Sequence, residues 1–123
     1  MIPLLKANIY SNLQHTTSKI EAKAYSWASC SELSQDMFDV ILMSDVVYDP
    51  CAYDPLIQAL TNLSDNNTTI IMAHRSRNPK DHIFFKNAKM HFNLVPLVGK
   101  ERFSSSDVCL WKFERLNKQL FFV

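Results

Sequence analysis

Glycine is nearly absent from this sequence. Gly99 is the only glycine among 123 residues, whereas average usage of about 7 % would give roughly nine. Loops that cradle a phosphate or a cofactor with their backbone need glycine, because it adopts positive φ and leaves room for close approach. The chain therefore has no glycine-rich turn of its own for holding a ligand, which argues against a small nucleotide-binding α/β protein.

The sequence also lacks an excess of charge of either sign and lacks long apolar runs. Thirteen Lys and Arg residues face twelve Asp and Glu residues, a net charge of +1, so there is no electrostatic case for nucleic acid or for an anionic membrane surface. No apolar run approaches the roughly 20 residues that span a bilayer. The first residues are too soon polar for a signal peptide. We therefore expect no nucleic-acid partner and no membrane partner.

Clustered cysteines are the third absence. Cys30, Cys51 and Cys109 are odd in number and widely spaced, and neither they nor the histidines have the spacing of metal ligands. We expect no metal site. Reduced thiols fit a chain in the cytoplasm, and in the nucleus too.

The composition is that of an ordinary globular protein, with 47 % hydrophobic and 20 % charged residues. We expect one domain over residues 1–123, although not necessarily a complete one. Periodicity and breakers predict, in order, a helix over 3–13, a strand from 20 to about 27, a strand over 38–47, a helix from about 54, a strand over 68–73, a helix over 80–91, and strands over 92–98 and 108–113 joined by a hairpin loop. Asp49-Pro50 ends the strand over 38–47. The helix after it carries an apolar stripe of Leu56, Ile57, Leu60 and Leu63. This order predicts an α/β sheet that is parallel until an antiparallel end.

The strongest local signal is the strand over 38–47. Its uninterrupted Val-Ile-Leu-Met is typical of a strand covered on both faces. Ligands of open parallel sheets lie beyond the carboxyl ends of the strands. Here Asp45 and Tyr48 follow the apolar run, and they offer a carboxylate for an amine, a hydroxyl and an aromatic face. The alternative is that Asp45 caps a turn and Tyr48 packs on the next helix.

Two other strand ends carry candidate groups. Trp27 offers an indole that stacks on a planar ligand, although a lone tryptophan is often structural. His74, Arg75 and Arg77 offer groups that bind a carboxylate or an acidic partner. Arginines in a loop are also commonly just solvated. Asp81 fits the first turn of a helix, where the helix dipole favours an acid.

The segment Phe38–Pro50 resembles the fourth strand of the small seven-β-strand protein-lysine methyltransferases (methyltransferase family 16, the methyltransferase-like group), whose hallmark D-x-x-Y is matched by Asp45 and Tyr48. Pro3-Leu4-Leu5 through Asn12 resembles the family's P-L-L-x-x-N-x-x-x-N helix. Trp27 resembles the tryptophan closing the third strand, and residues 71–81 resemble the fifth strand and its basic exit loop, with Arg75 and Arg77.

The resemblance implies a class I, Rossmann-like methyltransferase fold with strand order 3-2-1-4-5-7-6, a protein substrate with an acceptor lysine, and S-adenosylmethionine as cofactor. It implies that Trp27 lies against the adenine and that Ser44 lines the cofactor pocket. Asp45 and Tyr48 would shape the channel for the lysine, and Arg75 and Arg77 are the candidates for binding substrate.

The departures from the family pattern matter equally. The family's first two strands, its glycine-rich turn and its ribose-binding acid would all precede Met1, so the resemblance implies an N-terminally truncated domain with weak or absent cofactor binding. Two hypotheses follow. The chain is a protein-lysine methyltransferase-like polypeptide, or it is a catalytically inactive remnant that serves as a protein-binding module.

Overall fold

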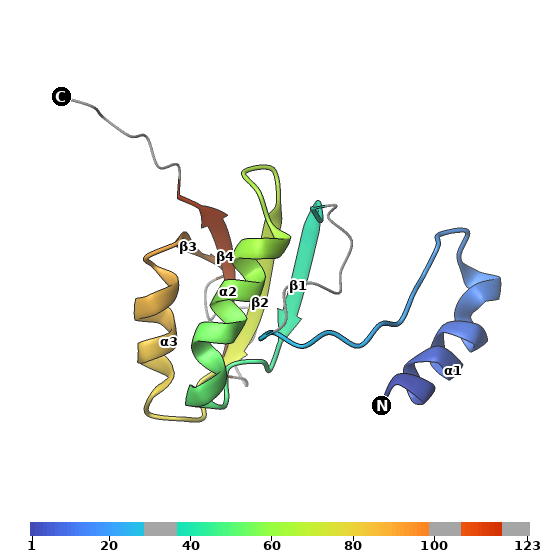
Figure 1. Ribbon diagram of the computed structural model, residues 1–123, viewed down its shortest axis with the longest axis horizontal. Coiled ribbons are helices and arrows are strands. Elements are labelled where there is room, and N and C mark those ends of the chain that lie inside the picture. The colour runs from blue at the N-terminus through green and yellow to red at the C-terminus, as the bar shows by residue number, and fades with distance from the viewer. Residues whose placement is uncertain (29–36, 99–106, 117–123) are drawn as a thin grey trace.

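A computed structural model describes residues 1–28, 37–98 and 107–116 of the chain. Within these ranges, no helix is both long enough and apolar enough to cross a membrane. The elements, shown in Figure 1, are α1 (Ile2–Asn12), a 3₁₀ turn (Leu13–His15), β1 (Val40–Ser44), a second 3₁₀ turn (Pro50–Ala52), α2 (Tyr53–Leu63), β2 (Thr69–Arg75), α3 (Asp81–Ala88), β3 (Phe92–Val98) and β4 (Val108–Arg115).

Four strands form one mixed sheet in the order β1-β2-β4-β3. β1 and β2 are parallel, with Ser44 beside Ala73 at their carboxyl ends, while β4 runs antiparallel to both of its neighbours. The predicted α/β class, the parallel pair and the antiparallel hairpin are thus confirmed. The order also corresponds to strands 4-5-7-6 of the class I methyltransferase fold, which makes this a partial sheet of that fold.

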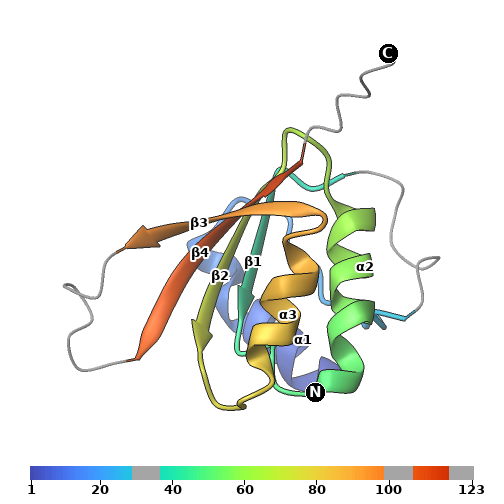
Figure 2. The same ribbon diagram turned by 90° about the vertical axis from the view of Figure 1, so that its left-hand side faces the viewer.

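Helices α2 and α3 cover one face of the sheet (Figures 1 and 2). The predicted apolar stripe of α2 is buried at Leu56, Ile57 and Leu60 and half-buried at Leu63. Burial alternates along β2, so every second side chain faces the helices. The largest fully buried side chains are Phe84, Phe92, Phe113, Ile70 and Met72. Burial of each such side chain stabilises the fold by about 1.5–3 kcal/mol.

The prediction that β1 is covered on both faces is wrong. Val40 is 55 % exposed and Leu42 is 74 % exposed, whereas Ile41 and Met43 are half-buried. The reason is that α2 and α3 cover one face only, and no described element lies over the other. An apolar run indicates that its side chains favour burial, but it does not identify the segment that covers them.

The predicted strand from 20 to about 27 is also wrong, because these residues form no strand. A strand is defined by backbone hydrogen bonds to a neighbour, and no neighbouring strand lies beside this segment in the parts that the structure describes. Helix α1 does form where predicted. It buries no residue, and Leu4 and Leu5 are exposed, because it stands apart from the sheet (Figure 1).

Several boundaries differ from those predicted. β1 ends at Ser44 rather than at residue 47, because the backbone turns at the next residue, and β4 continues to Arg115 rather than ending at residue 113. β2 continues through His74 and Arg75, which were expected in a loop, because both residues pair with β4 at Cys109 and Val108. Helix α3 begins at Asp81 and ends at Ala88, three residues earlier than expected. Most of the loop predicted to join β3 and β4 lies outside the described residues.

The two edge strands of the sheet differ in how they meet solvent. β3 carries Pro96 and a register irregularity, both of which discourage pairing with another strand. β1 has no such feature, and among the described elements no strand pairs with its outer side.

Leu42→Lys should therefore reduce concentration-dependent self-association of the chain while changing the free energy of unfolding by less than about 0.5 kcal/mol.

Sedimentation velocity over a range of concentrations measures this effect. Met90→Lys is the matched control, because Met90 is 68 % exposed and follows α3, away from the β1 edge. Equal self-association of the two variants would rule out the β1 edge as its cause.

Candidate functional site

The carboxyl ends of β1 and β2 lie side by side, and a sharp backbone turn follows β1. The backbone N–H of Asp45 donates to the carbonyl of Ala73 over 3.4 Å, which extends the ladder by one residue. Asp45 then adopts a φ of +57°, the one positive φ among the described non-glycine residues. Aspartate is one of the few residues that tolerate this left-handed conformation, and such conformations concentrate at functional sites.

Val47 anchors the segment that follows. Its side chain is buried in the core, whereas Asp45 and Tyr48 on either side of it are exposed. Val46 is half-buried and packs against the same core, so two anchored residues between two exposed ones fix the path of the backbone and leave both exposed side chains on the surface. The turn at Asp49-Pro50 is closed by the carboxylate of Asp49, which accepts from the backbone N–H of Cys51 over 3.0 Å.

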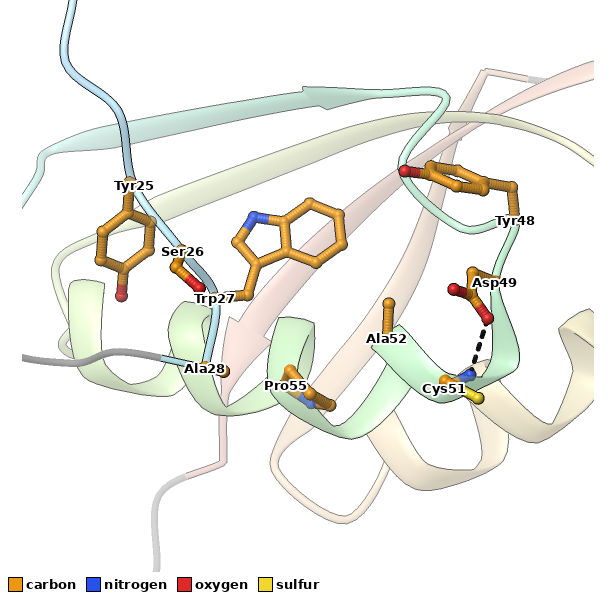
Figure 3. A pocket seen from close by; sticks show the side chains of 9 residues that line it. All are labelled: Tyr25, Ser26, Trp27, Ala28, Tyr48, Asp49, Cys51, Ala52 and Pro55. Carbon is orange, nitrogen blue, oxygen red and sulfur yellow. Dashed lines mark hydrogen bonds between the residues drawn. The ribbon is translucent and has the colours of Figure 1, made fainter.

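Tyr48 and Trp27 line the same pocket, although they are far apart in the sequence. We call this the indole pocket; it has a volume of about 430 Å³ and is lined by Tyr25, Ser26, Trp27, Ala28, Tyr48, Asp49, Cys51, Ala52 and Pro55. Figure 3 shows the indole between the segment that carries it and the turn that carries Tyr48. Trp27 also packs against the core cluster, so it is at once a structural residue and a pocket wall.

The remaining predicted site residues line a second pocket at the ends of β1 and β2. We call this the arginine pocket; it has a volume of about 240 Å³ and is lined by Ser44, Asp45, Ala73, Arg75, Arg77 and Val108. The six predicted site residues are therefore divided between two pockets. The predicted cofactor residues Trp27 and Ser44 lie in different ones, and so do Asp45 and Tyr48.

Both arginines of the second pocket face carboxylates. Arg77 Nη1 lies 3.4 Å from Asp45 Oδ2, and each side chain is more than half exposed. Arg75 Nη2 lies 4.0 Å from Asp107 Oδ2, and Asp107 is 89 % exposed. Ion pairs this exposed contribute at most about 1 kcal/mol each to stability. They are therefore easily exchanged for other partners.

Beneath this pocket, Asp81 holds the loop between β2 and α3. Its carboxylate is buried and accepts from the hydroxyl of Tyr53 over 3.0 Å, and from the backbone N–H groups of Arg77 over 3.2 Å and Asn78 over 3.4 Å. Burial raises the pKa of Asp81, but these hydrogen bonds and the nearby His74 outweigh it, so the pKa lies below its ordinary value. Asp81 thereby fixes the backbone from which Arg77 extends.

His74 does not belong to the surface group of basic residues in which the sequence placed it. Its side chain is buried, its ring packs edge-on against Phe85 with centroids 5.2 Å apart, and Nε2 lies 3.3 Å from Asp81 Oδ2 without hydrogen-bond geometry. The alternation of β2 explains this, because His74 follows Ile70 and Met72 on the helix-facing side. Asp81 is in the first turn of α3 as predicted.

The contact between Tyr53 and Asp81 had no signal in the sequence. The two residues are 28 positions apart and belong to different helices. Burial raises the pKa of the Tyr53 hydroxyl, and its hydrogen bond to Asp81 adds to the effect. The phenol therefore stays protonated and donates to the carboxylate.

The pockets suit an organic ligand better than a metal. The described residues contain no group of three or more His, Cys, Asp or Glu side chains that could hold a metal ion. The indole pocket has the volume typical of a small-molecule site and an aromatic wall with a few polar groups. The rings of Trp27 and Tyr48 offer aromatic faces on which a planar group can stack. The chain has no glycine-rich turn for the methionine part.

The strand order, with Asp45 directly after the carboxyl end of a parallel strand, is the arrangement that the methyltransferase resemblance implied. A family model described as lysine methyltransferase matches residues 1–91. The chain belongs to this lysine methyltransferase family.

Curated relatives agree with this assignment. The mouse (Mus musculus) protein N-lysine methyltransferase METTL21A is 31 % identical over 121 residues, which cover 96 % of this chain and 54 % of the relative. The proteins of the same name from Xenopus tropicalis and Danio rerio are 28 % and 26 % identical, over 74 % and 76 % of this chain and 42 % and 44 % of theirs. The chain thus spans about half the length of the curated relatives it matches.

Proposed function

We propose that this chain serves S-adenosylmethionine-dependent methylation of a lysine side chain on a protein. The observation that carries the proposal is the segment from Asp45 to Tyr48, which contributes one side chain to the arginine pocket and one to the indole pocket. In a chain of the lysine methyltransferase family, a carboxylate and an aromatic wall so close in sequence supply a place for an amine next to a place for the cofactor. Reduced thiols at Cys51 and Cys109 fit our proposal that it works in the cytoplasm or the nucleus.

On the acceptor side, the amine must reach the cofactor as a neutral group with its lone pair free. When bound, S-adenosylmethionine supplies a methyl group on a positively charged sulfur. In our proposal the acceptor ammonium would first give one proton to water, and Asp45 would then accept a hydrogen bond from the neutral amine and orient its lone pair. The nitrogen that gains the methyl carbon would leave as a methylammonium ion. Tyr48 closes the channel against water. Positioning and exclusion of water supply most of the rate in this scheme.

On the cofactor side, Trp27 stacks on the adenine and Ser44 lines the path toward the acceptor. Because no glycine-rich turn is present, we expect the chain alone to bind the cofactor weakly. Isothermal titration with S-adenosylmethionine tests the proposal against the rival one, a protein-binding module without activity. Micromolar binding by this chain would refute the rival, whereas no heat at millimolar cofactor and no transfer to an array of lysine peptides would refute our proposal.

Trp27→Leu provides a sharper test of the indole pocket. Aromatic stacking contributes about 0.5–1.5 kcal/mol beyond burial, so we expect the affinity for S-adenosylmethionine to fall by about threefold to tenfold. Titration of both proteins measures the change. Tyr10→Leu is the control, because Tyr10 is a 79 % exposed aromatic residue on α1 that lies outside this pocket. Equal affinities of Trp27→Leu and the unsubstituted chain would remove Trp27 from the cofactor site.

A further inference from the structure

The arginine pocket carries more positive than negative charge. Among the described side chains that line it, Asp45 is the one carboxylate and Arg75 and Arg77 bring two guanidinium groups; the carboxylate of Asp107 lies outside the lining, 4.0 Å from Arg75 and almost fully exposed. If an acceptor lysine enters beside Asp45, its ammonium raises the count to three cations against one anion. Because like charges this close repel one another and the exposed Asp107 screens Arg75 only weakly, an anion that arrives with the lysine favours its entry.

Arg77 occupies the position at Asp45 that a lysine would take. Its guanidinium lies 3.4 Å from the carboxylate, so the structure shows that this carboxylate pairs with a cation. The backbone of Arg77 is held by Asp81, but its side chain is 59 % exposed. An arriving ammonium group therefore displaces the Arg77 guanidinium without disturbing the loop. The displaced guanidinium stays at the rim of the pocket, where it can pair with another anion.

Arg75 is available for the same anion. Its contact with Asp107 is 4.0 Å long and involves a carboxylate that is almost fully exposed, so it holds Arg75 only weakly. Each guanidinium group presents a fork of N–H donors that matches a carboxylate, which accepts hydrogen bonds on both oxygens.

We infer that the arginine pocket binds a carboxylate of the substrate, and that the substrate class is an acceptor lysine with an acidic group close to it. The inference rests on the proposed function. On binding, the lysine replaces Arg77 at Asp45, and Arg77 and Arg75 take the substrate carboxylate. Two exposed ion pairs within the protein, Arg77 with Asp45 and Arg75 with Asp107, are exchanged for two with the substrate. Because Arg75 and Arg77 need a substrate carboxylate to replace those lost partners, the exchange selects against lysines in basic or neutral surroundings.

Binding of defined peptides to the 123-residue chain tests the inference. The probes are short alanine–serine peptides with a central lysine and a single glutamate at each nearby position on either side. Their matched set carries glutamine at the same positions, and a third set carries the carboxylate only at a free C-terminus. We expect glutamate to strengthen binding by about fivefold at one or two positions, the scale of exposed ion pairs. The third set distinguishes a side-chain carboxylate from a terminal one.

The double substitution Arg75→Gln and Arg77→Gln should bring the glutamate and glutamine peptides within about twofold of each other. Lys89→Gln is the control that removes a positive charge from an exposed residue after α3. The Lys89→Gln chain should still bind the glutamate peptides more tightly than the glutamine peptides. High salt should weaken this preference in the unsubstituted chain. Equal binding of the glutamate and glutamine peptides to the unsubstituted chain would overturn the inference. Methyl transfer to the lysine of either set, measured separately, would in that case still support the proposed function.

Discussion

Asp45→Asn should lower methyl transfer to lysine by about 100-fold while changing the affinity for S-adenosylmethionine by less than about threefold. Asparagine has nearly the same shape and also tolerates a φ of +57°, so the turn after β1 keeps its path. The change therefore isolates the negative charge. That charge faces Arg77 in the arginine pocket, whereas Trp27 and Tyr48 line the indole pocket. Loss at the acceptor with little loss at the cofactor is the signature of a positioning role for Asp45.

Transfer of labelled methyl groups to the best peptide of a lysine array, at saturating cofactor, measures the first quantity, and isothermal titration measures the second. Asp54→Asn is the matched control, because it removes an exposed carboxylate in the first turn of α2, outside both pockets. It should leave both quantities unchanged. An equal fall of transfer and cofactor affinity in Asp45→Asn would contradict the assignment of Asp45 to the acceptor channel.

Asp81→Asn should lower the free energy of unfolding by about 3 kcal/mol at neutral pH. The buried carboxylate accepts from Tyr53 and from the backbone N–H groups of Arg77 and Asn78. An amide group has one acceptor oxygen and turns N–H donors toward groups that are themselves donors. At least one buried donor is then left without an acceptor, which costs more than the loss of an exposed hydrogen bond. Urea unfolding measures the difference.

The same variant should show a changed response to acid. Because the folded pKa of Asp81 lies below its ordinary value of 3.8, its carboxylate stabilises the fold fully above that value and loses this contribution as the pH falls below it. The gap between the unsubstituted chain and Asp81→Asn should therefore be widest at neutral pH and should shrink below about pH 4. Asp39→Asn, at an exposed residue before β1, is the control. A gap that stays constant down to about pH 3 would show that the charge of Asp81 contributes nothing.

Much of the architecture could be read from local patterns. The apolar run before Ser44, the breaker at Asp49-Pro50 and the stripe along α2 predicted a strand, a turn and a helix, and all three are present. The antiparallel hairpin of β3 and β4 is confirmed as well. These elements were predictable because a strand with one buried face repeats apolar residues at every second position and a helix at every third to fourth. Both periods are visible in the sequence itself.

The failed predictions concern contacts with segments elsewhere. The alternation from Ile20 to Trp27 satisfied the period of a strand, yet no described strand pairs with it. The run in β1 had the composition of a strand covered on both faces, and it lies at the edge with Leu42 exposed. The period and composition of a segment depend on that segment alone. Its pairing with another strand and its burial under a helix depend on a second segment elsewhere in the chain.

The sequence by itself determined the α/β class, the family and the candidates Asp45, Tyr48 and Trp27, because these depend on short motifs and local periods. Tertiary structure alone decided that Trp27 and Tyr48 share a pocket and that Arg77 lies against Asp45. It alone revealed that Asp81 is buried against Tyr53. Each of these contacts joins residues that are 21 or more positions apart, and side chains so distant in sequence are brought together only when the strands and helices that carry them pack.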